Sequence, residues 1–308
     1  MPVPDYVTGY DLQQATRLAY EGDIEAVDAF LRSRPAFKSQ LGAHILLRAA
    51  ERGYVLLVAH LLTDEGVNRN YVALADGRNA FSAFLQAAQW GHAPVVTVLL
   101  ADERVDPNKS WGPWDMTALV LAAMHGFVLV VTALLADERV DPNMPRYGGI
   151  TALMSATFAG HVQVVMLLLA DERVNPNMAS ESGVTALIDA VRWRKPQVVK
   201  MLLADERVNP NLKDNTRASL LLIAVRSGDH LVVSILLRDC RVAISMKAHN
   251  AIVRNTEEEI SWVTPGIYLL VWSRIHPESH PFSSDLIAEI ASFESESRVL
   301  SLECGELG

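Results

Sequence analysis

Residues 101–108 read Ala-Asp-Glu-Arg-Val-Asp-Pro-Asn, and this octapeptide decides the fold because it recurs. Copies that differ only by Asp or Asn at the sixth place begin at residues 136, 170 and 204, so the period is 34 or 35 residues. Weaker copies occupy 63–70 and 238–245. A constant period of this length is typical of stacked structural repeats, in which each unit buries its apolar side against its neighbours.

Each period predicts two helices and a loop. In one period, Thr151 is a residue type that caps helix starts, and Gly160 can adopt the left-handed conformation that ends a helix. Val162, Val165 and Leu168 then recur at helical spacing. The proline of the octapeptide cannot continue that helix, because it lacks the N–H donor and restricts the residue before it. We therefore expect two antiparallel helices and an extended loop in each period.

With these features the sequence resembles the ankyrin repeat. The resemblance rests on helix starts, turns, Leu-Leu pairs and loop ends, namely Thr117-Ala-Leu, Thr151-Ala-Leu, Thr185-Ala-Leu, Gly91-His92, Gly160-His161, the pairs that begin at 99, 134, 168 and 202, and Asn108, Asn143, Asn177 and Asn211. The chain departs from the family in having alanine for the usual proline, and Val120, Met154 and Ile188 for the usual histidine. The resemblance implies an all-α solenoid of antiparallel helix pairs with extended hairpin loops.

The same pattern extends outward to about seven repeats over residues 8–245. The first two would place helices at 13–22 with 23–31 and at 44–53 with 54–62, and both end repeats should be degenerate because one side faces water. We expect residues 1–245 to form the array. Residues 246–308 carry no repeat, and we expect a helical C-terminal cap there, with helices at 267–275 and 285–293; a small separate domain, or the functional domain itself, is the alternative.

Composition excludes several classes of protein. Lys plus Arg number 27 against 36 Asp plus Glu, a net charge of −9, which argues against nucleic acid as the main partner. No apolar run is long enough to span a membrane. Cys240 and Cys304 alone cannot build a disulfide framework or a thiolate zinc site, and no phosphate loop or paired metal-binding histidines occur. We expect no cofactor or metal, and an intracellular, cytoplasmic location because residues 1–5 lack a secretory signal pattern.

The repeated Asp-Glu-Arg triplets resemble acid and base chemistry. Because they are nearly identical in successive repeats, we expect them to cross-link adjacent loops and to solvate one edge of the array. Function should instead lie where repeats differ. The resemblance implies that the loop tips, residues 109–116, 144–150, 178–184 and 212–218, line a concave groove with the exposed side of the first helices.

On each first helix, two places four residues apart share one face of the helix. Together with the tips they predict a binding groove, formed by Gln86, Trp90, Trp111, Trp114, His125, Tyr147, Ser155, Phe158, Asp189 and Trp193. Four of the six tryptophans of the chain fall in this set. Exposed aromatic side chains are common anchors of recognition.

Two hypotheses of different classes follow. In the leading one the chain is a non-enzymatic scaffold that binds a peptide or partner domain, with Trp90, Trp111, Trp114, Tyr147 and Trp193 as anchors and with His125 and Asp189 giving polar specificity. In the alternative the groove binds or converts a small apolar molecule, with His125 and Asp189 as acid and base. A structural interpretation also stays open: Trp90 and Trp193 could cover a neighbouring helix, and Trp111 and Trp114 could pack within their own loop.

The sharpest local deviation is Arg192-Trp-Arg-Lys-Pro196, where Arg194 and Lys195 take the places of Gly and His. A non-glycine residue at a tight turn is strained, and strain tends to mark a site. The three basic residues would favour an acidic peptide or a carboxylate ligand. Drift in a single repeat is the simpler alternative.

Overall fold

The computed structural model describes residues 7–68, 73–75, 79–245, 247 and 248. The chain divides into two compact units, residues 1–181 and 182–308, which are described separately below. The expected C-terminal cap, with its helices at 267–275 and 285–293, lies outside the described residues apart from Lys247 and Ala248.

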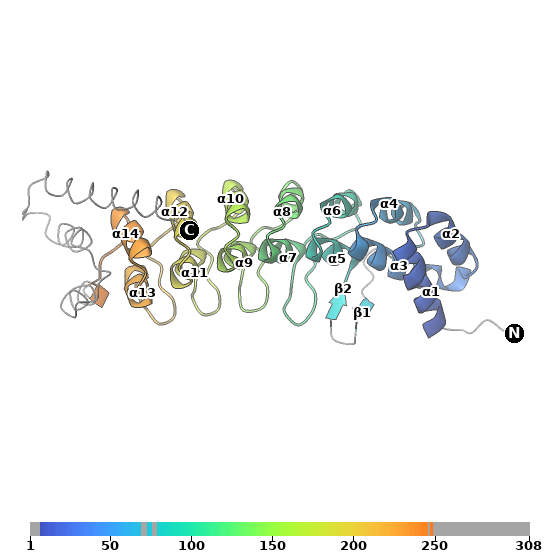
Figure 1. Ribbon diagram of the computed structural model, residues 1–308, viewed down its shortest axis with the longest axis horizontal. Coiled ribbons are helices and arrows are strands. Elements are labelled where there is room, and N and C mark those ends of the chain that lie inside the picture. Colours follow the sequence, from blue (N-terminus) through green and yellow to red (C-terminus); the bar gives the residue numbers. More distant parts are fainter. Residues whose placement is uncertain (1–6, 69–72, 76–78, 246, 249–308) are drawn as a thin grey trace, which may run out of the picture. The chain divides into compact units, whose positions relative to one another are not determined.

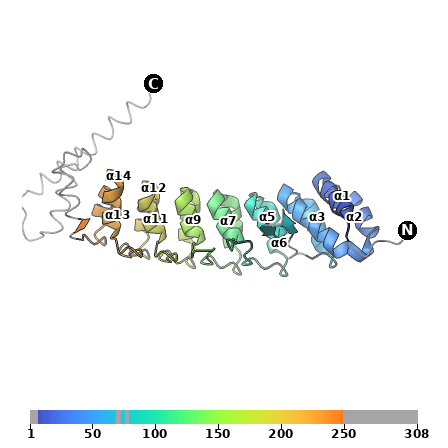
Figure 2. The same ribbon diagram turned by 90° about the horizontal axis from the view of Figure 1, so that it is seen from below.

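The first unit is built from five helix pairs. They are α1 (Gly9–Glu21) with α2 (Ile24–Arg32), α3 (Lys38–Arg52) with α4 (Val55–Thr63), α5 (Ala83–Gln89) with α6 (Ala93–Leu100), α7 (Ala118–His125) with α8 (Val128–Leu135), and α9 (Ala152–Ala159) with α10 (Val162–Ala170). First helices pack on first helices in chain order, and from α4 onward second helices pack on second helices. The result is two rows of helices, of which Figure 2 shows α5, α7 and α9 side by side.

The second unit holds two more pairs, α11 (Ala186–Arg192) with α12 (Pro196–Ala204) and α13 (Leu220–Ser227) with α14 (His230–Arg238). Here α11 packs on α13 and α12 on α14. The described residues thus contain seven helix pairs, as the period of the sequence predicts, and the chain is helical as expected.

Local capping explains where the helices begin and end. Thr151 Oγ1 accepts a hydrogen bond from Met154 N at 3.3 Å, and the same arrangement recurs at other first helices. Gly126 ends α7 with φ at 76°, where a Cβ atom would lie 2.6 Å from Nδ1 of His161. Glycine is required there by both the backbone conformation and the close ring. The ring also ties one repeat to the preceding one, because its Nε2 lies 3.1 Å from the carbonyl oxygen of Met124.

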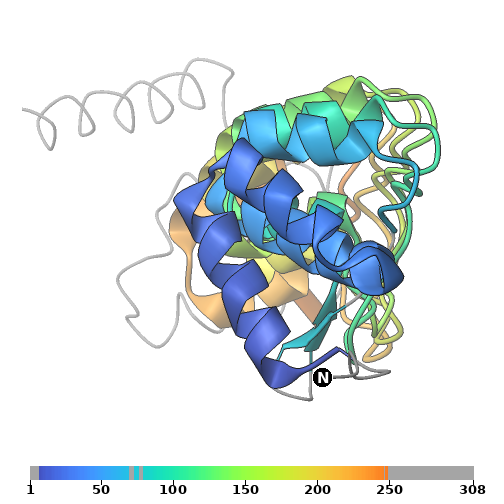
Figure 3. The same ribbon diagram turned by 90° about the vertical axis from the view of Figure 1, so that its right-hand side faces the viewer.

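The loops of the first unit confirm that the octapeptide is scaffold. Arg173 forms a salt bridge with Asp171 of its own loop at 2.7 Å and donates to the carbonyl oxygen of Leu135, in the preceding repeat, at 2.7 Å. Asn143 Nδ2 donates to the carbonyl oxygen of Arg173 at 2.7 Å, and its Oδ1 accepts from Asn175 N at 2.7 Å. Adjacent loops are therefore cross-linked, and they gather on one side of the helices in the end-on view of Figure 3.

Three features of the N-terminal repeats differ from the prediction. Helix α1 starts four residues before 13, because Thr8 and Asp11 form a reciprocal capping box. Helix α3 starts six residues before 44, directly after the short 3-10 turn η1 (Pro35–Phe37). The loop after α4 contains an antiparallel pair of short strands, β1 (Ala73–Ala75) and β2 (Asn79–Phe81), which the sequence pattern did not predict.

Candidate functional site

The loop before α7 forms a tight hairpin. Trp111 and Met116 exchange two backbone hydrogen bonds of 3.1 Å, and Gly112 and Asp115 adopt positive φ angles of 79° and 48°. This geometry leaves Trp114 at the tip of the loop. The next loop closes in the same way, with Arg146 N donating to the carbonyl oxygen of Ile150 at 2.9 Å.

Two aromatic rings from these neighbouring tips meet at the surface. Tyr147 N donates to the carbonyl oxygen of Trp114 at 2.9 Å, so the backbones of the two loops are joined. The ring centroids lie 5.9 Å apart at an interplanar angle of 73°, the edge-to-face arrangement that aromatic pairs favour. Trp114 is nevertheless 52% exposed and Tyr147 59% exposed. The two rings are therefore held together by the joined backbones and by their edge-to-face contact, while about half of each side chain remains exposed to solvent.

Trp111 lies differently from its neighbour at the tip. Its side chain is half-buried, its indole Nε1 is buried without a hydrogen-bond partner in the described structure, and Nζ of Lys109 lies 4.6 Å from the ring centroid. The contact with Lys109 favours the structural alternative for Trp111, in which the ring packs within its own loop, whereas the exposed Trp114 does not fit it. Trp114 and Tyr147, unlike Trp111, are therefore the exposed aromatic side chains of these two tips.

At the end of α5, Trp90 is 55% exposed while its Nε1 donates to Oε1 of Gln86 at 3.0 Å. Gln86 is buried, which contradicts the expectation that it faces a ligand. A polar residue four positions before an exposed ring can form a hydrogen bond with that ring instead of with a binding partner. The structure therefore assigns Gln86 to holding the orientation of Trp90.

The same arrangement recurs in the second unit. Trp193 ends α11, is 50% exposed, and donates a side-chain hydrogen bond to the carboxylate of Asp189. Burial raises the pKa of Asp189 above its usual range, and the charge of Arg192 and the hydrogen bond from Trp193 oppose that rise. Asp189 is accordingly a partner of Trp193 within its own helix.

The remaining predicted residues of the first unit fall into two groups. Ser155 is buried and its Oγ donates to the carbonyl oxygen of Thr151 at 3.0 Å, so the expectation that it lines the groove is wrong. His125 and Phe158 are exposed, at the end of α7 and on α9 respectively. The ring of His125 lies 5.7 Å from that of Phe127.

The acid and base hypothesis gains no support from these positions. His125 belongs to the first unit and Asp189 to the second, and each is described within its own unit. Among the described residues, no group of three or more His, Cys, Asp and Glu side chains is arranged to hold a metal ion. None of the helices in the described part of the chain is long and apolar enough to cross a membrane.

The deviant turn at the end of α11 is strained, as expected. Arg194 has a φ of 52° where other repeats carry glycine. Two of its three basic side chains have internal partners: Arg192 forms a 3.0 Å salt bridge with Asp214, and Arg194 donates to the carbonyl oxygen of Ser227. Asp214 is buried and lies 22 residues from Arg192, so the sequence pattern gave no signal of it.

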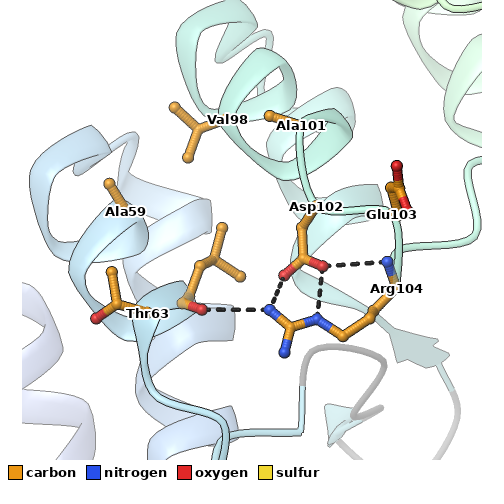
Figure 4. A pocket seen from close by; sticks show the side chains of 8 residues that line it. Ala59, Thr63, Val98, Ala101, Asp102, Glu103 and Arg104 are labelled. Carbon is orange, nitrogen blue, oxygen red and sulfur yellow. Dashed lines mark hydrogen bonds and ion pairs between the residues drawn. The ribbon is translucent and has the colours of Figure 1, made fainter.

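An open depression of about 560 Å³ lies between α4 and α6 (Figure 4). Apolar side chains of both helices line one part of it, among them Ala59 and Val98. Arg104 lines the other part, and its Nε forms an ion pair with Oδ1 of Asp102 at 2.7 Å. This ion pair belongs to the octapeptide scaffold, and the depression contains none of the predicted groove residues.

Paired antiparallel helices, glycine turns and cross-linked extended loops define a helical repeat scaffold whose exposed aromatic residues lie at loop tips and helix ends. Comparison with known proteins then specifies the class of repeat. The family model for ankyrin repeats, in three copies, matches residues 84–178 and, in an overlapping placement, 119–214. The chain therefore contains ankyrin repeats, and its fold is the all-α ankyrin solenoid.

A solved structure supports the fold. The crystal structure of the ankyrin repeat protein EF0377 is similar with a TM-score of 0.58 and 24% sequence identity, over 64% of this chain and 97% of that chain. A comparison with curated proteins gave no match. Ankyrin repeats are in general protein-interaction modules.

Proposed function

We propose that this chain binds a protein partner through the tip pair, which we define as Trp114 and Tyr147. The observation that carries the proposal is that these two large rings are more than half exposed while their backbones are joined. Exposed aromatic side chains bury a large area on binding, and prior ordering lowers the entropy lost in doing so. A fixed, exposed aromatic pair is therefore well suited to anchor a partner.

Trp90 and Phe158 extend the proposed surface along the first helices of the same unit. Both are more than half exposed, on α5 and α9. His125 on α7, between these helices in the row, is exposed as well and offers a polar group. We propose that a partner segment contacts these side chains in addition to the tip pair. The acid and base alternative is not pursued, because Asp189 accepts the indole hydrogen bond of Trp193.

The double variant Trp114→Ala/Tyr147→Ala tests the proposal. Partners captured with the wild-type chain would be identified, and their affinity for wild type and variant measured by calorimetry. We expect the variant to lose about 2 kcal/mol or more of binding free energy, roughly a thirtyfold weakening, because hot-spot aromatics contribute on this scale. Its melting temperature should stay close to that of the wild type, because the lost rings are largely exposed.

Leu129→Ala is the matched control. Leu129 is an equally apolar surface residue, 73% exposed, but it lies on α8 in the row of second helices. Its loss should leave binding unchanged. The proposal fails if the tip-pair variant binds as tightly as the wild type, or if its main effect is a lowered melting temperature, since the rings would then be packing.

A further inference from the structure

One stretch of this acidic chain carries a net positive charge. Residues 182–248 contain eleven Lys and Arg against six Asp and Glu, a net charge of +5, although the whole chain has a net charge of −9. The rest of the sequence therefore carries −14. Such segregation is not required by the repeat, whose octapeptide supplies more acidic than basic residues.

Several of these charges gather at the end of α11 and the turn that follows it. Arg192 and Arg226 are 34 residues apart and lie in the last turns of the neighbouring helices α11 and α13. The guanidinium of Arg194 donates to the carbonyl oxygen of Ser227, the residue that follows Arg226. This hydrogen bond brings the turn after α11 against the end of α13, within one unit.

Two of the cationic groups are available to a ligand. Within the described residues, the ammonium of Lys195 and the guanidinium of Arg226 form no hydrogen bond or ion pair. Arg192, by contrast, is paired with Asp214, although its side chain remains 41% exposed. The surface thus offers uncompensated positive charge beside a partly neutralised arginine.

An exposed aromatic side chain is adjacent to these residues in the chain. Trp193 stands between Arg192 and Arg194 in the chain and is 50% exposed. Its indole N–H is held by Asp189, which fixes the ring in place. We call Arg192, Trp193, Arg194, Lys195 and Arg226 the basic turn surface. It combines a fixed aromatic ring with cations, which suits a ligand that carries both carboxylates and an apolar side chain.

We infer that the basic turn surface binds an acidic segment of a partner protein, with an apolar side chain of that segment covering Trp193. This inference rests on the proposed function and adds the charge of the partner and a second place of contact. Arginine and lysine bind carboxylates by charge-assisted hydrogen bonds, and complementary charge selects the partner. A long nucleic acid is a poor ligand, because the −14 elsewhere in the sequence opposes an extended polyanion.

The test uses the full chain and a fluorescein-labelled peptide, Glu-Glu-Leu-Glu-Glu-Phe-Glu-Glu, with binding followed by fluorescence anisotropy. We expect the peptide to bind the wild type. Lys195→Glu/Arg226→Glu should weaken binding roughly tenfold, since the attraction of each of these two cations for the peptide is replaced by a repulsion. Within the described residues the two charged groups form no hydrogen bond or ion pair, so the variant should fold normally. Trp193→Ala should weaken the same peptide but not an all-glutamate peptide of equal length.

The matched control is Lys200→Glu/Lys247→Glu, which changes two exposed lysines of the same unit and alters the net charge by the same amount. Equal weakening by both double variants would overturn the inference, because only net charge would then matter. Absence of peptide binding to the wild type overturns it as well.

Two further outcomes complete the test. Equal binding of a single-stranded oligonucleotide would overturn the assignment to a protein segment. The tip-pair variant should bind the acidic peptide as the wild type does, because its substitutions lie in the other unit. A failed inference would therefore leave partner capture by the tip pair intact, and a failed proposed function would leave peptide binding intact.

Discussion

At the ends of α5 and α11, a tryptophan and the residue four positions before it work as a pair. Gln86 holds the indole N–H of Trp90 at 3.0 Å, and Asp189 holds that of Trp193. In both cases the polar side chain orients the ring, and the ring itself is exposed to solvent. Substituting Gln86 or Asp189 should therefore change recognition through the position of the ring, because each side chain accepts the hydrogen bond that orients it.

A single buried histidine links pH to stability. His44 on α3 is 8% exposed and its Nε2 lies 2.8 Å from Oγ1 of Thr16 on α1. Burial, and secondarily the charge of Arg48, lowers the pKa of His44 from 6.5 to about 4. In the folded chain the ring is thus neutral at pH values where the unfolded chain already binds a proton. Its contribution to stability is complete above pH 6.5 and is lost as the pH falls toward about 4.

We therefore expect the free energy of unfolding of the wild type to decrease as the pH is lowered across this range. The loss due to His44 should be about 2 to 4 kcal/mol. His44→Gln, which can still bond Thr16, should remove most of this slope in urea unfolding curves. His60→Gln is the control, since His60 is 38% exposed, and should keep the slope. A wild-type slope in His44→Gln would show that another group is responsible.

At the scale of the element, hydrogen bonds between the loops link neighbouring repeats. Asn143 joins two loops by two hydrogen bonds, whereas Glu138 in the same octapeptide is exposed. Asn143→Ala would leave Asn175 N and the carbonyl oxygen of Arg173 without these partners. We expect it to lower the free energy of unfolding by about 1 to 3 kcal/mol, because each of the two lost hydrogen bonds contributes about 0.5 to 1.5 kcal/mol.

Glu138→Ala is the comparison within the same loop, and it should change the urea midpoint little, because exposed surface substitutions are usually near neutral. Similar urea midpoints for the two variants would contradict the assignment of the octapeptide asparagine as a residue that links neighbouring loops. A larger loss for Glu138→Ala would reverse the roles that the structure gives these residues.

Periodicity predicted the helix pairs, the glycine turns and the scaffold role of the octapeptide, because these features repeat and each follows from local chemistry. It did not predict the early start of α3, since the length of that helix depends on its packing against α1 and α5. Helical spacing also identified the helix face shared by Gln86 and Trp90 but not how deeply each is buried. Burial depends on the neighbouring repeat, which is why the helical spacing predicts Ser155 in the groove although the structure buries it.

At the scale of the whole molecule, the arrangement of charge along the chain is more informative than the net charge. A net −9 alone predicts repulsion of acidic ligands, whereas residues 182–248 carry +5. The two effects act over different ranges. The Debye length is about 30 Å at 0.01 M salt and about 10 Å at 0.1 M, so distant charges are screened first and close pairs last.

This difference predicts the salt dependence of acidic-peptide binding. Between about 0.01 M and 0.1 M salt the affinity should change little, because screening weakens both the repulsion by the rest of the chain and the local attraction. Between about 0.1 M and 1 M it should fall steeply, since only the close contacts of Lys195 and Arg226 remain to be screened. Anisotropy titrations of wild type and Lys195→Glu/Arg226→Glu measure both ranges, and the variant should lack the steep fall. An affinity that rises throughout would mean that repulsion by the whole chain dominates and would contradict binding through the cations of the basic turn surface.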